Sequence, residues 1–275
     1  MAERVALVTG ASSGFGLGVA RGLQERGWRV HALLRDTVSA PPALAGMHLT
    51  QCDLSDEEQV ARAAAGIERL DCLVNNAGYG LAGPLAGYSA AQMRRQLEVN
   101  LIAPALLVQA LLPALERAQG MIINVSSVLG EIGMPMNSFY CASKFALEGF
   151  SEALFHELKP RGIRVALVKP GGYRTRFGRN LVMGEKTLRE GSADAQKLAT
   201  FLTMRSRMLA ATGRDPAPVV ATILRIAHMR NPPLHNRVGA EVRVARVLRR
   251  LLPERLLLAI VGKMNRRRMP EEGNA

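Results

Sequence analysis

The chain has 275 residues, of which 48% are hydrophobic and 21% charged. This composition supports one large folded domain and excludes general disorder. The three cysteines, Cys52, Cys72 and Cys141, show no C-x-x-C or metal-ligand spacing, which excludes a disulfide framework and favours a reduced, cytosolic chain. The apolar run before Gly10 is too short for a signal peptide, and no uninterrupted apolar run approaches the roughly 20 residues of a membrane-spanning helix.

The formal net charge of +13 is concentrated in two segments. Residues 174–214 carry nine basic residues against three acidic ones, and residues 241–275 carry nine against four. The rest of the chain is nearly balanced. The basic character therefore belongs to these two segments and not to the body of the fold.

Short apolar runs alternate with helical patterns along the chain. The expected strands are residues 5–9, 30–34, 47–51, 71–75, 121–125, 164–168 and 235–238. The expected helices are residues 15–27, 56–65, 89–117 (interrupted by Pro104 and Pro113), 138–158, 216–230 and 241–268. This alternation predicts βαβ units, and hence a Rossmann-type doubly wound parallel α/β sheet of about seven strands with helices on both faces.

Two local features refine this outline. Ser55 followed by Glu58 predicts a capping box at the start of the second helix. After Pro170 the alternation stops, and residues 174–214 show no clear strand, which predicts a functional lid or a mobile segment. We therefore expect a single domain over residues 1–240 that includes this lid, followed by a basic helical extension over residues 241–275.

A glycine-rich turn follows the first strand and opens the first helix. Gly10, Gly14 and Gly16 follow the pattern T-G-x-x-x-G-x-G. Glycines let the backbone approach a pyrophosphate, and a helix N-terminus offers free N–H groups and a positive dipole end. The turn therefore predicts a nucleotide site, although glycines also serve tight packing.

The end of the second strand reads Leu34-Arg35-Asp36. In such folds an acid at this place binds a free ribose 2′-hydroxyl, whereas an arginine accommodates a 2′-phosphate. Arg35 favours NADP(H). The alternative is that Asp36 is the ribose-binding acid, displaced by one or two residues.

Tyr140 and Lys144 stand four residues apart in an expected helix, so both side chains lie on one face. A neighbouring cation favours the ionised form of a phenol, so the pair could act as a proton donor near neutral pH. The alternative is a core tyrosine beside a lysine that extends to solvent.

No metal site is expected, because the histidines are dispersed without ligand spacing. They are His31, His48, His156, His228 and His235.

Seven elements, in order and spacing, resemble the short-chain dehydrogenase/reductase family over residues 5 to 175. They are T-G-x-x-x-G-x-G at residues 9–16, an acid at Asp53, N-N-A-G at residues 75–78, a helix asparagine at Asn100, Ser127, the Tyr140/Lys144 pair, and Pro170-Gly171 followed by Thr175. Residues 140–149 are also similar to the 17β-hydroxysteroid and retinol dehydrogenase branch.

The resemblance implies roles for these residues. Tyr140 would be the general acid/base, Ser127 would hold the substrate oxygen, Lys144 would tune Tyr140 and bind the nicotinamide ribose, and Asn100 would position a relay water. Ser126, the neighbouring serine, is assigned to strand termination. The implied cofactor-binding residues are Gly10, Ser12, Ser13, Gly14, Phe15, Gly16, Arg35, Asp53, Leu54, Asn76, Ala77, Gly78, Tyr140, Lys144, Pro170, Gly171 and Thr175. Family members commonly pair through their fifth and sixth helices, so a homodimer or homotetramer is expected.

We therefore expect a cytoplasmic NADP(H)-dependent oxidoreductase that interconverts an alcohol and a ketone or aldehyde on a largely apolar substrate. The substrate expectation rests on apolar residues of segments expected to line the pocket: Met134, Met136, Phe177, Leu181, Val182, Met204 and Met208. These residues could equally pack the lid onto the body. A ketoreductase for carrier-bound fatty or polyketide intermediates and a silent cofactor-sensing regulator are the alternatives, and no nucleic-acid partner is expected. The basic tail is expected either to contact an anionic membrane surface or to cap the body or a partner subunit.

Overall fold

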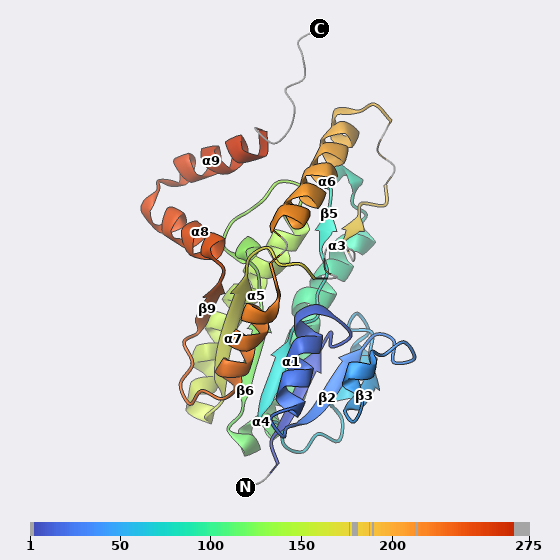
Figure 1. Cartoon of the computed structure of the whole chain (residues 1–275), viewed down its shortest axis with the longest axis vertical. Helices are drawn as coiled ribbons and strands as arrows, with labels where there is room; N and C mark the ends of the chain where they lie inside the picture. The colour runs from blue at the N-terminus through green and yellow to red at the C-terminus, as the bar shows by residue number, and fades with distance from the viewer. Residues whose placement is uncertain are drawn as a thin grey trace.

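The computed structural model describes residues 3–175, 177, 181–186, 188, 190–212 and 214–266. Its centre is a parallel sheet of seven strands in the order β3-β2-β1-β4-β6-β7-β9 (Figure 1). The strands are β1 (Val5–Thr9), β2 (Arg29–Leu34), β3 (His48–Gln51), β4 (Cys72–Asn75), β6 (Met121–Val125), β7 (Arg164–Pro170) and β9 (His235–Val238). The Rossmann-type fold expected from the sequence is confirmed, and each strand lies within two residues of its expected position.

Helices cover both faces of this sheet. Along the chain, the described helices are α1 (Gly14–Gln24), α2 (Glu57–Ala64), α3 (Ala90–Leu97), α4 (Ala103–Ala118), α5 (Ser138–Leu158), α6 (Ala193–Thr212), α7 (Ala217–Ala227), α8 (Ala240–Leu251) and α9 (Glu254–Arg266). Helices α1 and α7 pack on one face, and α2, α4 and α5 pack on the other (Figure 1).

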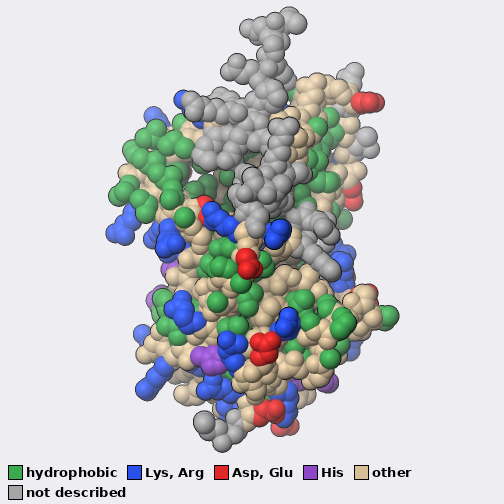
Figure 2. All heavy atoms as spheres, viewed as in Figure 1, with side chains coloured by type: hydrophobic (Ala, Val, Ile, Leu, Met, Phe, Trp, Pro, Cys, Tyr) green, Lys and Arg blue, Asp and Glu red, His purple; other side chains and the backbone are tan. Residues whose placement is uncertain are grey.

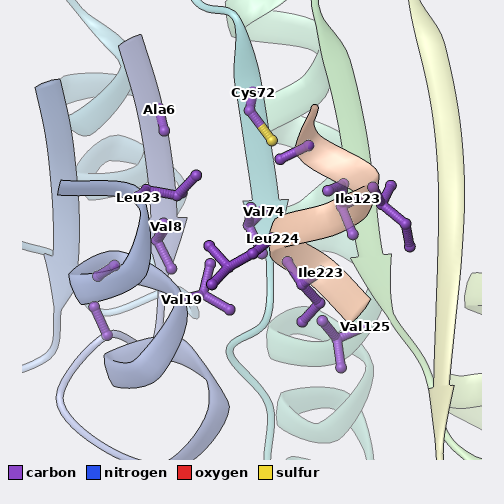
Figure 3. Packing of buried hydrophobic residues seen from close by; sticks show 14 of the residues in the cluster. Ala6, Val8, Val19, Leu23, Cys72, Val74, Ile123, Val125, Ile223 and Leu224 are labelled. Carbon is purple, nitrogen blue, oxygen red and sulfur yellow. The ribbon is translucent and has the colours of Figure 1, made fainter. Parts of the chain in front are cut away.

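The strands are buried on both faces, and their side chains alternate between two hydrophobic clusters. In β1, Ala6 and Val8 point toward α1 and α7, whereas Leu7 points toward α4. Figure 3 shows the first cluster, in which Ile223 and Leu224 of α7 meet residues of the sheet. Burial on both faces is why these strands read as continuous apolar runs in the sequence.

The N-terminus of α2 corrects the expected capping box. The N-cap residue is Asp56, whose Oδ1 accepts a hydrogen bond from the Gln59 backbone N–H at 3.1 Å. Ser55 instead donates its hydroxyl to Asp53 at 2.8 Å. Aspartate and serine are comparable N-caps, but the aspartate charge also complements the positive end of the helix dipole.

The helix expected over residues 89–117 is not interrupted by its prolines. A π turn, Glu98–Ile102, joins α3 to α4, so residues 90–118 form one helix. Pro104 falls in the first turn of α4, where the missing N–H costs little. This helix is long and apolar enough to cross a membrane, contrary to the expectation from apolar runs, but Leu107, Leu111 and Leu115 are buried against the sheet as in a core helix.

The lid contains more regular structure than its sequence indicated. A two-residue strand, β8 (Val182–Met183), pairs in parallel with β5 (Leu81–Ala82), and α6 supplies twenty further helical residues. The expectation of a segment without a strand was therefore wrong. The tail forms two helices, α8 and α9, and α9 extends away from the sheet (Figure 1). The arginines at 267 and 268, expected to close the tail helix, lie outside the described residues.

Candidate active site

The glycine turn is fastened to the end of the neighbouring strand β4. The Thr9 hydroxyl accepts hydrogen bonds from the backbone N–H groups of Asn76 and Ala77, at 3.0 and 2.9 Å. In return, the Asn76 side chain donates to the Thr9 carbonyl at 2.9 Å. Because both strands are parallel, this contact brings the glycine turn and the N-N-A-G segment together at the carboxyl edge of the sheet.

The turn has the shape and the unsatisfied groups that a dinucleotide pyrophosphate needs. Gly10 and Gly14 have φ angles of +66° and +57°, and a Cβ atom on Gly16 would lie 2.3 Å from the Gly10 carbonyl oxygen. Ser13 is the N-cap of α1, but its side chain makes no capping hydrogen bond. The first N–H groups of α1 therefore have no side-chain cap and can meet an anion. The residues present fit a dinucleotide phosphate.

The other predicted cofactor residues lie around this turn or at adjacent strand ends. Thr175, beyond β7, packs on Gly14, where a Cβ atom would come 3.3 Å from the threonine Cβ. The structure thus brings together three groups of predicted residues: Gly10, Ser12, Ser13, Gly14, Phe15 and Gly16 before and in α1, Asn76, Ala77 and Gly78 after β4, and Pro170, Gly171 and Thr175 at the end of β7. Gly171 is further confined by α8, because a Cβ atom there would collide with the Glu241 carboxylate.

The adenosine end of the predicted site lies beyond β2 and β3. Arg35 is exposed, and no ion pair involves it among the described residues. Asp36 uses its carboxylate to cap the following turn, accepting hydrogen bonds from Ser39 and from the Val38 backbone, and these bonds lower its pKa. Asp53 and Leu54 follow β3. Partial burial would raise the pKa of Asp53, but hydrogen bonds from Ser55 and Arg95 outweigh it and hold the pKa below its usual value.

Lys144 is an ionisable group buried at the centre of the site. It is only 4% exposed, and its Nζ donates a hydrogen bond to the Val125 carbonyl at the end of β6, at 2.9 Å. The same Nζ lies 5.9 Å from the centre of the Tyr140 ring. Burial lowers the pKa of Lys144 to about 8, although the Glu148 carboxylate opposes the decrease. The expected pairing of Tyr140 and Lys144 on one face of α5 is present, and the lysine does not extend to solvent.

Ser127 and Tyr140 complete the predicted catalytic group. Ser127 is partly exposed, and its Oγ accepts the Leu129 backbone N–H at 3.1 Å, which leaves the hydroxyl proton able to donate. Ser126 is buried, and its backbone N–H extends the ladder to β7, consistent with strand termination. Tyr140 is 7% exposed and lies under the lid, with its ring 5.4 Å from that of Phe177.

Asn100 occupies the π turn, a feature that often marks functional sites. Its Oδ1 accepts the Tyr79 N–H, and its Nδ2 donates to the Tyr79 carbonyl and to Ser143, both at 3.1 Å. A relay water at Asn100 would therefore bind either the remaining lone pair of Oδ1 or the backbone carbonyl. Pro104, four residues later, has no N–H to donate to that carbonyl.

The structure adds polar residues that the sequence did not single out. Gln96 is fully buried and bonds Leu81 N–H and the Tyr79 carbonyl, so it holds the strand beneath the lid. The side-chain amide of Asn75 donates to the Oδ1 of buried Asn124 at 2.9 Å. Single buried amides have no characteristic spacing, so only the three-dimensional contacts identify them.

The apolar residues expected to line the pocket divide into groups. Phe177 and Leu181 pack over Gly80, and Met134 and Met136 are partly buried, whereas Val182 is 39% exposed and does not line the interior. The side chains of residues 204 and 208 lie outside the described part. Surface clefts of about 640 and 510 Å³ lie along α7, and neither is lined by the catalytic group. In this conformation Phe177 closes the space over Tyr140.

Comparisons with known proteins agree with this geometry. Residues 4–186 match the family model described as short chain dehydrogenase. The chain is 34% identical over 250 residues to 3-ketodihydrosphingosine reductase of Bacteroides thetaiotaomicron, covering 89% of this chain and 91% of that protein. It is 36% identical over 255 residues to retinol dehydrogenase 8 of Homo sapiens, covering 86% and 82%.

Solved structures extend the match to three dimensions. A short-chain dehydrogenase from Streptomyces avermitilis has a TM-score of 0.79 and 31% identity, with 97% of this chain and 98% of that chain covered. A metagenomic short-chain oxidoreductase in complex with NADP has a TM-score of 0.65 and 31% identity, covering 86% and 95%. Other neighbours contain NADH or NAD. The chain belongs to the short-chain dehydrogenase/reductase family and is related to its retinol and hydroxysteroid dehydrogenases.

Proposed function

We propose that this oxidoreductase uses NADP(H) to interconvert an alcohol and a ketone or aldehyde on a largely apolar substrate, with Tyr140 as general acid/base. The observation that carries the proposal is the buried Lys144 ammonium beside the Tyr140 ring, at the strand edge where Ser127 and the glycine turn also lie. A cytoplasmic location, and assembly of two or four copies, belong to the same proposal.

Each side chain has a defined task in the reducing direction. The nicotinamide supplies the hydride when it is bound. Ser127 donates its hydroxyl proton in a hydrogen bond to the substrate carbonyl oxygen, and Tyr140 transfers its phenolic proton to that oxygen as negative charge develops. The Lys144 ammonium stabilises the phenolate that remains, because the attraction between the two charges is stronger in a buried site than in water.

Tyr140→Phe tests the acid directly. The variant keeps the ring that packs against Phe177 and removes only the proton donor, so carbonyl reduction should fall 10²- to 10⁴-fold. NADPH affinity, measured by fluorescence titration, should stay nearly unchanged and serves as the folding control. A variant that retained more than about a tenth of wild-type turnover would show that another group is the acid.

The proposed preference for NADP(H) rests on the contrast between Arg35 and Asp36. Arg35 is exposed at the carboxyl end of β2, whereas the Asp36 carboxylate is already engaged by the following turn. A 2′-phosphate would therefore meet an arginine with no other ion-pair partner among the described residues. The NADP complex of a 31% identical relative supports this choice.

Arg35→Ala should weaken NADPH binding about 10- to 150-fold, because a charge-assisted contact contributes roughly 1.5–3 kcal/mol. NADH affinity should change little. Asp36→Asn is the matched control and should leave both affinities near wild type. Equal affinities of the wild type for NADPH and NADH, with NADH binding lost in Asp36→Asn, would assign the ribose contact to Asp36 instead.

The apolar substrate is supported by the lid and by the relatives. Phe177 and Leu181 present carbon surface directly above Tyr140 and Gly80. The names of the two curated relatives specify retinol and a ketodihydrosphingosine, both substrates with long apolar portions. A substrate of this kind would bury its apolar portion against the lid and direct its carbonyl toward Ser127.

The C-terminal helices present an apolar surface that the body does not cover. We propose that residues 1–240 form the oxidoreductase domain and that the extension touches an anionic membrane surface. Helix α8 is attached to the domain, since Val242 and Ala245 are buried and Glu241 accepts the Gly172 N–H at 3.0 Å. Its other side exposes apolar residues, and α9 continues the surface (Figure 2). These residues are Val244 (54% exposed), Val247 (52%), Leu251 (72%), Leu256 (48%) and Leu258 (60%).

Charge decides between a lipid surface and a second copy of the chain. Val244, Val247 and Leu251 follow helical spacing and form one stripe, and the exposed Arg243 and Arg250 flank it. In a two-fold symmetric contact the same patch meets itself, so the arginines of both copies would approach one another. An anionic lipid surface would attract each arginine instead, while the stripe enters the acyl boundary.

The wild type should co-sediment with vesicles that contain anionic lipid, less so as salt increases, and not with neutral vesicles. The triple variant Val244→Asn/Val247→Asn/Leu251→Asn should lose this binding but keep its activity. Val38→Asn, which replaces an isolated valine that is 95% exposed, is the control and should bind like the wild type. If vesicles never retain the wild type and the triple variant dissociates an oligomer, the stripe is a contact between subunits.

A further inference from the structure

A buried ionic cluster lies directly behind the catalytic group. Glu131 follows the loop that carries Ser127, Glu148 lies on α5, Lys169 on β7 and Arg237 on β9. The first three are 5%, 7% and 2% exposed. Lys169 Nζ lies 2.8 Å from Glu131 Oε1 and also contacts Glu148 Oε2, and Arg237 Nη2 lies 2.8 Å from Glu131 Oε1. The Lys169 ammonium thus joins β7 to α5 and to the loop, and the Glu131 carboxylate joins β9 to them.

Helix α5 connects this cluster to the active site. Tyr140, Lys144 and Glu148 succeed one another at intervals of four residues, so they form a ladder along one face of the helix. The Glu148 carboxylate contacts the buried Lys169 ammonium on β7 and lies one helical turn from Lys144 on its own helix. Burial raises the pKa of Glu148, and contacts with Lys169 and Ser126 oppose the rise.

The cluster also holds the loop that carries Ser127. A Cβ atom on Gly130 would lie 2.7 Å from Ser126 Oγ and 3.1 Å from Glu148 Oε1, so this loop packs closely against α5. The side chain of the following residue, Glu131, accepts hydrogen bonds from Lys169 and Arg237. The backbone carbonyl of Glu131 accepts a further hydrogen bond from Arg249 of α8. Movement of Glu148 or Lys169 would therefore displace the loop beneath Ser127.

Buried charges are expensive to desolvate, and apolar residues of similar volume often stabilise a fold equally well. This cluster is thus poorly explained by stability alone, and its position suggests a role in the reaction. We propose that Glu148 is a positioning residue that keeps Lys144 in its cationic form and, through Lys169 and Glu131, fixes the loop carrying Ser127. This inference rests on the proposed function of Tyr140 and Lys144.

Other titratable groups near Glu148 do not replace it in this role. His235 Nδ1 lies 3.9 Å from Glu148 Oε2, and its Nε2 lies 3.5 Å from Glu152 Oε1. Burial lowers the pKa of His235, and Lys169 and Arg237 lower it further, so the imidazole is neutral where Lys144 titrates. Although these three side chains could converge on a cation, Glu148 Oε2 already accepts the Lys169 ammonium.

Glu148→Gln tests the proposal, with Glu152→Gln as the matched control one turn further along α5. The Glu152 side chain is 56% exposed. Removing the Glu148 anion lowers the pKa of Lys144, so the ammonium is lost at lower pH. The alkaline limb of kcat/KM for carbonyl reduction should therefore move about one unit toward lower pH. Glu152→Gln should show the wild-type profile, and Glu148→Asp, which keeps the charge, should restore most of it.

A readout that needs no turnover separates this inference from the proposed function. The chain has only six lysines, so the ¹³C shift of the Lys144 ε-carbon can be followed with pH and assigned by Lys144→Met. It should titrate at lower pH in Glu148→Gln than in the wild type. If Glu148→Gln does not fold, Glu148→Asp, which keeps the charge but draws it back from Lys144 by one methylene, should show a smaller shift in the same direction. Identical Lys144 titrations in wild type and Glu148 variants would overturn the proposal, whether or not a substrate has been found.

Discussion

The Lys144 ammonium is buried beside Tyr140 at the carboxyl edge of the sheet, and the elements around it are arranged to hold a charge in that place. A desolvated cation needs hydrogen-bond acceptors or anions close by. The Val125 carbonyl supplies one at the end of β6, and Glu148 supplies the other from the next turn of α5. In the proposed reaction this charge stabilises the phenolate form of Tyr140, so the chemistry would depend on how the sheet and α5 meet.

The parallel sheet explains why residues distant in the chain gather here. Strands β1, β4, β6 and β7 all end at one edge, which places the glycine turn, Asn76, Ser127 and the Pro170 turn side by side. The hydrogen bonds of Thr9 then fix the glycine turn to the end of β4. None of these residues indicates a function by itself. The proposed cofactor and substrate site follows from their common position at the carboxyl edge of the sheet.

Much of this arrangement is predictable because it follows from repeated local rules. Apolar runs separated by helical patterns located all seven strands, and the glycine turn and the Tyr140/Lys144 spacing predicted the two ends of the proposed site. Choices between equivalent local signals were less reliable. Ser55 and Asp56 are both good N-caps, and only the neighbouring contacts select Asp56. Pro104 and Pro113 suggested interruptions, but the first turn of α4 accommodates the missing N–H of Pro104, and Pro113 lies inside α4 without ending it.

Contacts between distant, non-periodic residues could not be predicted. The pairing of β8 with β5 depends on two residues of each segment, and neither is long enough to show alternation. Gln96, Ser143 and the Glu131–Lys169–Glu148 cluster have meaning only through partners brought together by the fold. These are also the residues that determine how firmly the catalytic group is held.

A crystal structure of the ternary complex with NADPH and a carbonyl-containing inhibitor would test the central claim most directly. The carbonyl oxygen should lie within about 2.6–3.2 Å of both Tyr140 Oη and Ser127 Oγ, with Lys144 still bonded to the Val125 carbonyl. Phe177 should have moved aside to cover the apolar part of the inhibitor. An inhibitor carbonyl bound away from Tyr140, with Phe177 still packed on its ring, would contradict the account.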